Sequence, residues 1–170
     1  MIGMVKAVVL QAPVSDREDA MREPSYDKNI ATARSLVGDG KGLEMMPRSA
    51  FWAPITAKRF LDLQEFDGTD DFFSSDLTDD RLGEKLGHMG SNLPCVLVAF
   101  SGADEYVPED IDSRSLTDRL CKAMNVHCKE GDKQVAEALY LDTANHNLSV
   151  GDVATFLEKV GEILERSKNL

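Results

Sequence analysis

Two side chains suited to acid–base chemistry each follow an apolar stretch that is typical of a β-strand. Asp104 comes shortly after the apolar run 94–100, and His146 comes shortly after the run 136–141. Neighbouring parallel strands lie about 4.8 Å apart, so loops leaving adjacent strand ends can bring a carboxylate and an imidazole together. A buried aspartate that orients a histidine makes the histidine a general base for a hydroxyl nucleophile. We therefore predict Asp104 and His146 as catalytic residues, with Glu105 as the alternative acid.

Each of these residues also has a purely structural interpretation. Asp104 could be a turn residue whose carboxylate accepts from nearby backbone, because it follows the tight turn at Ser101 and Gly102. His146 could be a surface residue that holds its own loop. The position of both residues after successive strands favours the catalytic interpretation.

The nucleophile that such a pair would activate has no recognisable motif in these 170 residues, because the sequence contains no Gly-x-Ser-x-Gly elbow. Ser15 and Ser101 also follow predicted strands, so either could be proposed in its place. Neither has the flanking glycines of a strand–turn–helix elbow, and we expect neither to be the nucleophile. An acid–histidine pair without a serine retains little catalysis, so we expect the chain alone to be inactive.

The elements that position the pair are predicted to be those of an α/β fold. Residues 5–12, 94–100 and 136–141 are apolar at consecutive positions, which is typical of parallel strands covered on both faces. A helix capped by Asp112 or Ser113 is predicted between the last two strands. A second helix is predicted after the last strand, where residues 149–152 match a capping box.

The long segment between the first two strands differs from the rest of the chain. Helical patterns occur around 27–37, 56–64 and 78–86, and no convincing strand is present. A connection of this length exceeds a plain crossover between parallel strands. We therefore predict a core formed by residues 1–15 and 93–170, and a helical cap or lid formed by residues 16–92.

Composition narrows the classes of function. The formal net charge of −11 disfavours binding to nucleic acid and to anionic membrane surfaces. The group Cys121, His127 and Cys128 lacks a fourth ligand at a sensible spacing, so we predict neither a metal nor a cofactor. The odd number of cysteines, with no export signal in the first residues and no apolar stretch of membrane-spanning length, predicts a cytoplasmic protein.

Four segments in order, 8–18, 71–76, 101–108 and 145–148, carry a resemblance to a known family. Together they resemble an uncharacterised family of fungal and protist α/β-hydrolase-like proteins, and the resemblance spans essentially the whole chain. It implies an esterase-type serine hydrolase in which Asp104 is the triad acid and His146 the triad histidine. It also implies that this chain is the C-terminal half of such a protein, with a partial α/β-hydrolase fold whose three parallel strands are the last of the sheet.

Three hypotheses about function follow. The first is the C-terminal part of an esterase that needs a separate nucleophile and would act on a small-molecule ester. The second is an interaction module, in which the exposed edge of the strand at 5–12 forms a homodimer or binds a separate N-terminal half. The third is a complete small enzyme that uses the Asp104–His146 pair with another nucleophile.

Overall fold

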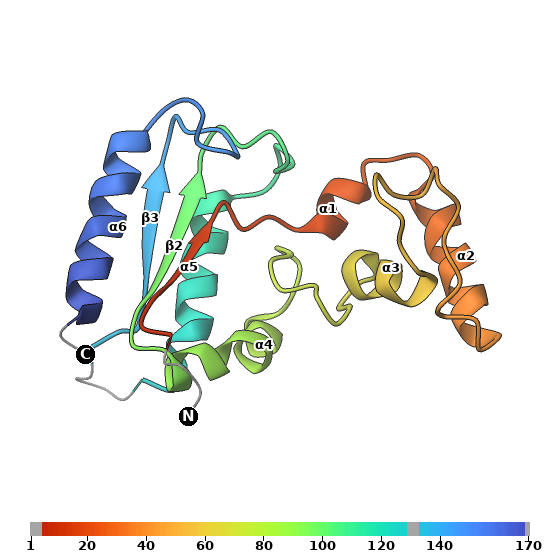
Figure 1. Cartoon of the computed structure of the whole chain (residues 1–170), viewed down its shortest axis with the longest axis horizontal. Coiled ribbons are helices and arrows are strands. Elements are labelled where there is room, and N and C mark those ends of the chain that lie inside the picture. Colours follow the sequence, from red (N-terminus) through yellow and green to blue (C-terminus); the bar gives the residue numbers. More distant parts are fainter. Residues whose placement is uncertain (1–4, 129–132, 169–170) are drawn as a thin grey trace. The chain divides into compact units, whose positions relative to one another are not determined.

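The computed structural model describes residues 5–128 and 133–168, and its centre is a three-stranded parallel sheet (Figure 1). The strands β1 (Val8–Gln11), β2 (Val96–Ser101) and β3 (Ala136–Leu141) lie in that order. All six residues of the central strand β2 are buried, which explains why the five residues before Ser101 are all apolar. The α/β fold class with three parallel strands is confirmed.

Because the strands are parallel, their carboxyl ends all lie at the same end of the sheet. The register places Gln11 beside Ala99 and places Ala99 beside Leu139. The loops that carry the predicted site residues leave the sheet at this end. Figure 1 shows the loops after β2 and β3 rising together from the same end of the sheet.

Two helices cover the sheet. Helix α5 (Ser113–Met124) packs on β2 and β3, and α6 (Val153–Lys168) packs on the same two strands from the other side (Figure 1). A third helix, α4 (Asp79–Asn92), packs on α5. The Asp112 carboxylate accepts a hydrogen bond from the Ser115 backbone N–H at 3.0 Å, so Asp112 rather than Ser113 caps α5.

The predicted capping box at 149–152 is wrong. Helix α6 begins only at Val153, and the Asp152 carboxylate instead accepts from the Thr143 backbone N–H and hydroxyl, both at 2.8 Å. The Ser149 side chain bonds Asn145 at 2.9 Å. Residues 149–152 therefore close the loop that contains His146 before the helix starts.

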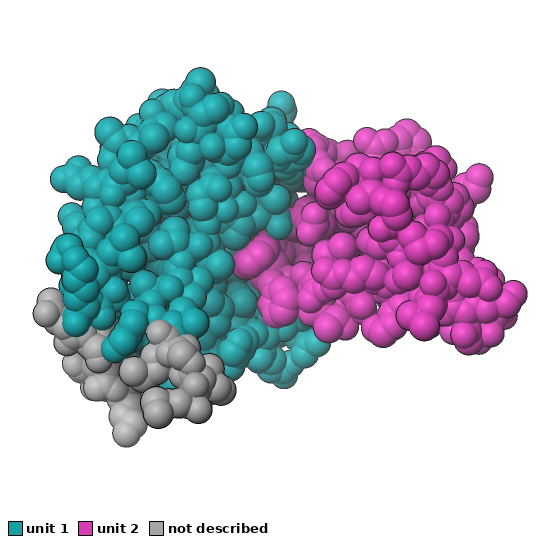
Figure 2. Space-filling model, viewed as in Figure 1, with its two compact units in different colours: residues 1–14, 75–170 teal, residues 15–74 magenta. Residues whose placement is uncertain are grey.

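The chain divides into two compact units (Figure 2). One comprises residues 1–14 and 75–170 and contains the sheet; the other comprises residues 15–74. The sequence placed all of 16–92 in one insertion, whereas α4 at Asp79–Asn92 belongs to the sheet-bearing unit because it packs on α5. The role of the second unit as a cap stays a prediction.

Residues 15–74 have a core of their own. Helices α1 (Asp16–Ala20), α2 (Tyr26–Gly38) and α3 (Ala57–Gln64) form this unit. Its apolar core joins residues of α2 and α3 with two residues of the connection between them: Ile30, Ala33, Met46, Ile55, Ala57 and Phe60. The unit thus buries apolar surface without needing the sheet.

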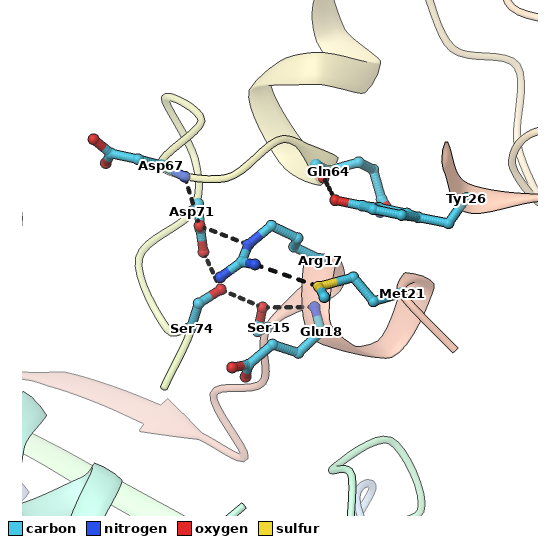
Figure 3. Close-up of polar contacts among 9 residues, drawn as sticks. All are labelled: Ser15, Arg17, Glu18, Met21, Tyr26, Gln64, Asp67, Asp71 and Ser74. Atoms are coloured by element: carbon cyan, nitrogen blue, oxygen red, sulfur yellow. Dashed lines mark hydrogen bonds and ion pairs between the residues drawn. The ribbon is translucent and has the colours of Figure 1, made fainter. Parts of the chain in front are cut away.

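A buried polar cluster ties the start of this unit to its end (Figure 3). The Arg17 guanidinium donates to the Asp71 carboxylate at 3.0 Å, and Ser74 donates to the same carboxylate. The hydroxyls of Ser15 and Ser74, the first and last residues of the unit, lie 2.6 Å apart. These bonds satisfy charged and polar groups that burial would otherwise penalise.

No helix in the described part of the chain is long and apolar enough to cross a membrane.

Candidate active site

Asp104 and His146 are in direct contact. The His146 Nδ1 and the Asp104 Oδ2 lie 2.9 Å apart, and the Asp104 side chain has no exposed surface. A carboxylate can only accept, so Nδ1 carries the proton of this bond. The His146 side chain is 34% exposed. Among the described residues no hydrogen-bond partner occupies its Nε2 nitrogen, so this nitrogen is available to receive a proton.

The backbone beyond the two strand ends creates this contact. Gly102 donates its N–H to the Leu141 carbonyl at 2.8 Å, and Ala103 donates to the Ala144 carbonyl at 2.9 Å. A Cβ atom on Gly102 would stand 2.6 Å from the Asp142 carbonyl oxygen, so only glycine allows the two loops to lie this close. The pairing of β2 and β3 thus continues into their loops and brings the acid beside the histidine.

Both oxygens of the Asp104 carboxylate are used. Oδ2 faces the imidazole, while Oδ1 accepts from the Tyr106 backbone N–H at 3.0 Å. Asp104 is therefore a turn residue and the partner of a histidine at once. The turn fixes the carboxylate so that one oxygen remains directed at the ring.

Glu105 contacts the backbone of His146 and not its ring. The Glu105 Oε2 accepts from the His146 backbone N–H at 3.1 Å. Hydrogen bonds from backbone N–H groups hold the pKa of the Glu105 carboxyl below its usual range. The bond from its own N–H has the larger effect and the bond from the His146 N–H the smaller. Asp104, and not the alternative Glu105, is thus the residue that meets the imidazole.

Sequence reasoning missed two further contacts. The Gln11 side-chain amide donates to the His146 carbonyl at 2.6 Å, and the Tyr106 ring meets the imidazole edge-on with centroids 4.8 Å apart. The only sequence signal for either was its position, Gln11 at the end of β1 and Tyr106 two residues after Asp104.

The two serines considered as nucleophiles have other environments. The Ser101 hydroxyl is buried and has no hydrogen-bond partner among the residues that the structure describes. The Ser15 hydroxyl bonds Ser74 and the Glu18 backbone N–H. Neither is bonded to His146, which a serine activated by that base would be.

Neither a metal cluster nor the cavity near the pair defines this site in the described residues. No group of three or more histidine, cysteine, aspartate or glutamate side chains there is arranged to hold a metal. A cavity of about 300 Å³ lies nearby, lined in part by Gly102, Arg114 and Asp142, but neither Asp104 nor His146 lines it. The Asp104–His146 pair is thus defined by its own contacts and not by this cavity.

Comparison with known proteins places the chain in a family. Residues 2–164 match the model of a family described as "Protein of unknown function (DUF1749)". The chain belongs to this family. Its curated relatives include the fusarinine C esterase sidJ of Aspergillus fumigatus, 31% identical over 86% of this chain and 49% of the relative. They also include the esterase AN6793 of Emericella nidulans, 30% identical over 68% of this chain and 40% of the relative.

A solved structure is similar as well. The siderophore hydrolase EstB from Aspergillus fumigatus matches with a TM-score of 0.77 and 28% identity, covering 96% of this chain and 58% of that chain. The fold is therefore that of part of an α/β-hydrolase-type esterase. The chain spans about half the length of the curated relatives that it matches.

Proposed function

We propose that this member of the DUF1749 family supplies the acid and the base of an esterase. Asp104 is the acid and His146 the general base. The observation that carries the proposal is the 2.9 Å bond between His146 Nδ1 and a fully buried carboxylate, with Nε2 left open. The esterases among the relatives of the chain support ester hydrolysis as the reaction.

The mechanism needs a serine from outside these 170 residues. As that serine attacks the ester carbonyl, its hydroxyl proton passes to His146 Nε2, and the protonated ring then gives it to the leaving alcohol. A water molecule next attacks the acyl-enzyme and gives its proton to the same nitrogen. The released acid leaves, and the proton returns to the serine. Asp104 holds the ring in the required tautomer and stabilises the imidazolium that forms in each half of the cycle.

In this proposal the chain has no turnover alone. The test is hydrolysis of p-nitrophenyl acetate by the 170-residue chain and by its His146→Ala variant, followed by the same pair in a longer protein with an in-frame Gly-x-Ser-x-Gly segment. We expect the two short chains to be equally inactive. In the longer protein, loss of the histidine should lower kcat by about 10⁶-fold. Turnover by the short chain that disappears with His146→Ala would contradict the need for an outside serine.

The relatives, and not the site, suggest which substrates to test. One relative is named as a fusarinine C esterase and the similar solved structure as a siderophore hydrolase, so fusarinine C and siderophore esters are the first natural substrates to test. Residues 15–74 are proposed to shape the substrate pocket as a cap. Deleting them from the longer protein with an in-frame Gly-x-Ser-x-Gly segment should change its preference among esters of different size and leave the Asp104–His146 bond intact.

A second candidate function rests on β1. In the described part of the chain this strand pairs with β2 on one side only, so its other edge offers unpaired backbone groups. We propose that a second strand binds there, either from another copy or from a separate N-terminal segment. Sedimentation at tens of micromolar tests the homodimer: a dimer supports it, and a strictly monomeric chain refutes it.

A further inference from the structure

The backbone of His146 is held at both of its polar groups by side chains from two other strand ends. Glu105, in the loop after β2, accepts from the His146 N–H at 3.1 Å. Gln11, the last residue of β1, donates to the His146 carbonyl at 2.6 Å. The two bonds have opposite sense, and a carboxylate only accepts, so Glu105 cannot make the bond that Gln11 makes.

The bond from Gln11 crosses the sheet. β1 is not a neighbour of β3, because β2 lies between them. The Gln11 side chain and the loop after β3 therefore meet across β2. The two residues are 135 positions apart in sequence, so no local preference of the chain explains the contact.

The backbone near both partners adopts conformations that non-glycine residues rarely use. Ala12, directly after Gln11, has a φ of 45°, and Leu148, two residues after His146, has a φ of 55°. Such conformations carry a free-energy cost and persist where surrounding contacts fix them. They indicate that the chain is bent at both places to keep the loop in position.

The ring is restrained as well as the backbone. The Tyr106 ring stands at 78° to the imidazole with centroids 4.8 Å apart. The His146 backbone is therefore bonded from two sides, and its ring packs against Tyr106. These contacts keep Nδ1 directed at Asp104 although a third of the His146 side chain is exposed.

We propose that Gln11 and Glu105 are positioning residues for His146. They fix the loop so that the imidazole donates from Nδ1 to Asp104 and keeps Nε2 free for a proton. This inference rests on the proposed function, in which His146 is the base. It adds that all three strands of the sheet, and not only the two that precede the pair, determine the state of the base.

The test is the tautomer of His146, read from ¹⁵N-histidine long-range NMR spectra of the 170-residue chain at a pH where the ring is neutral. The chain has three histidines, so His146→Ala identifies the signal and the other two serve as internal controls for folding. The tautomer of a neutral imidazole reports the hydrogen bond of its nitrogen. We expect His146 to be mainly the Nδ1–H form.

The variants test whether the bonds to the His146 backbone, and not any change of charge in the same loop, determine the tautomer. Glu105→Ala and Gln11→Leu should each lose the Nδ1–H form as the dominant tautomer. Glu105→Gln keeps an acceptor for the His146 N–H and should retain it. Glu109→Ala is the matched control, because it removes an exposed carboxylate that makes no hydrogen bond or ion pair with the described residues of the chain.

Each outcome decides one claim. If Glu105→Ala and Gln11→Leu both keep the wild-type tautomer, the positioning role is overturned while the proposed esterase function stands. If the unmodified chain shows a tautomer mixture that Asp104→Ala leaves unchanged, the Asp104–His146 bond itself is absent. The proposed function then fails together with the inference. Loss of the Nδ1–H form in Glu109→Ala as well would also overturn the assignment to Glu105.

Discussion

Replacing Asp71 with alanine should destabilise residues 15–74 strongly. The Asp71 carboxylate accepts from the Arg17 guanidinium at 3.0 Å and from the Asp67 backbone N–H at 3.1 Å. The Arg17 and Asp71 side chains are 3% and 1% exposed. An arginine cannot lose its proton, so the variant leaves a buried charge with its carboxylate removed.

The magnitude follows from this burial. Removing one partner of a buried ion pair costs about 3–5 kcal/mol. That is a large part of the roughly 5–15 kcal/mol by which a domain is stable. Since 1.4 kcal/mol is a factor of ten, amide hydrogen exchange within the core of this unit should accelerate by about 100-fold or more. Exchange in β2 should change far less, because β2 belongs to the other unit.

Three further variants test whether the buried ion pair is the cause. Arg17→Met should cost less than Asp71→Ala, because the carboxylate keeps its bonds from Asp67 and Ser74. The double variant should cost less than the sum of the two single changes, because the two residues are in contact. Arg22→Met is the control: its ion pair with Asp19 is exposed, and such pairs contribute about 0–1 kcal/mol.

Hydrogen exchange followed by mass spectrometry measures all four variants in one experiment. An Asp71→Ala effect no larger than that of Arg22→Met would refute the reasoning. A larger effect of Arg17→Met than of Asp71→Ala would also refute the reasoning. It would mean that the buried Asp71 carboxylate, and not the buried Arg17 guanidinium, costs more when its ion-pair partner is removed.

Three other predictions concern the sheet-bearing unit. Burial raises the pKa of the Cys121 thiol to about 12, so iodoacetamide at pH 8 should alkylate Cys128 first; equal rates by mass spectrometry would contradict this. Burial opposes the charged form of Glu137, but hydrogen bonds from α6 outweigh it and hold the Glu137 pKa below its usual range. Glu137→Gln should therefore cost about 1 kcal/mol in urea unfolding at pH 7 and nothing once the pH falls below the folded pKa; a constant difference would count against the ion pairs. Gly151→Ala should lower the melting temperature, because φ is 89° and a Cβ would stand 2.3 Å from the Thr143 oxygen; an unchanged melting temperature would refute this geometry.

The parts of the fold that the sequence predicts are those with local signals. β2 is buried on both faces, so its apolar residues are consecutive and readable. Thr56 and Thr78 lie at the starts of predicted helices, and each caps its helix through a side-chain bond. The prediction of a capping box at Ser149 was wrong because the same pattern also fits a loop. The Asp152 carboxylate accepts from the backbone N–H of Thr143, nine residues earlier.

The candidate site divides in the same way. Asp104 and His146 follow strand ends, and the geometry of parallel strands brings such positions together. Gln11 could not be found, because its partner is a backbone carbonyl 135 residues away, and backbone groups have no sequence signature. The Arg17–Asp71 pair was missed for a similar reason, since a charged pair 54 residues apart looks like ordinary surface charge until burial is known.

Labelling with a fluorophosphonate probe, mapped by mass spectrometry, tests the central claim most directly. We expect no labelled serine in the 170-residue chain. In a longer protein with an in-frame Gly-x-Ser-x-Gly segment, we expect labelling at that serine, lost when His146 is changed to alanine. Labelling of Ser15 or Ser101 in the short chain would contradict the account, as would labelling of the longer protein that does not depend on His146.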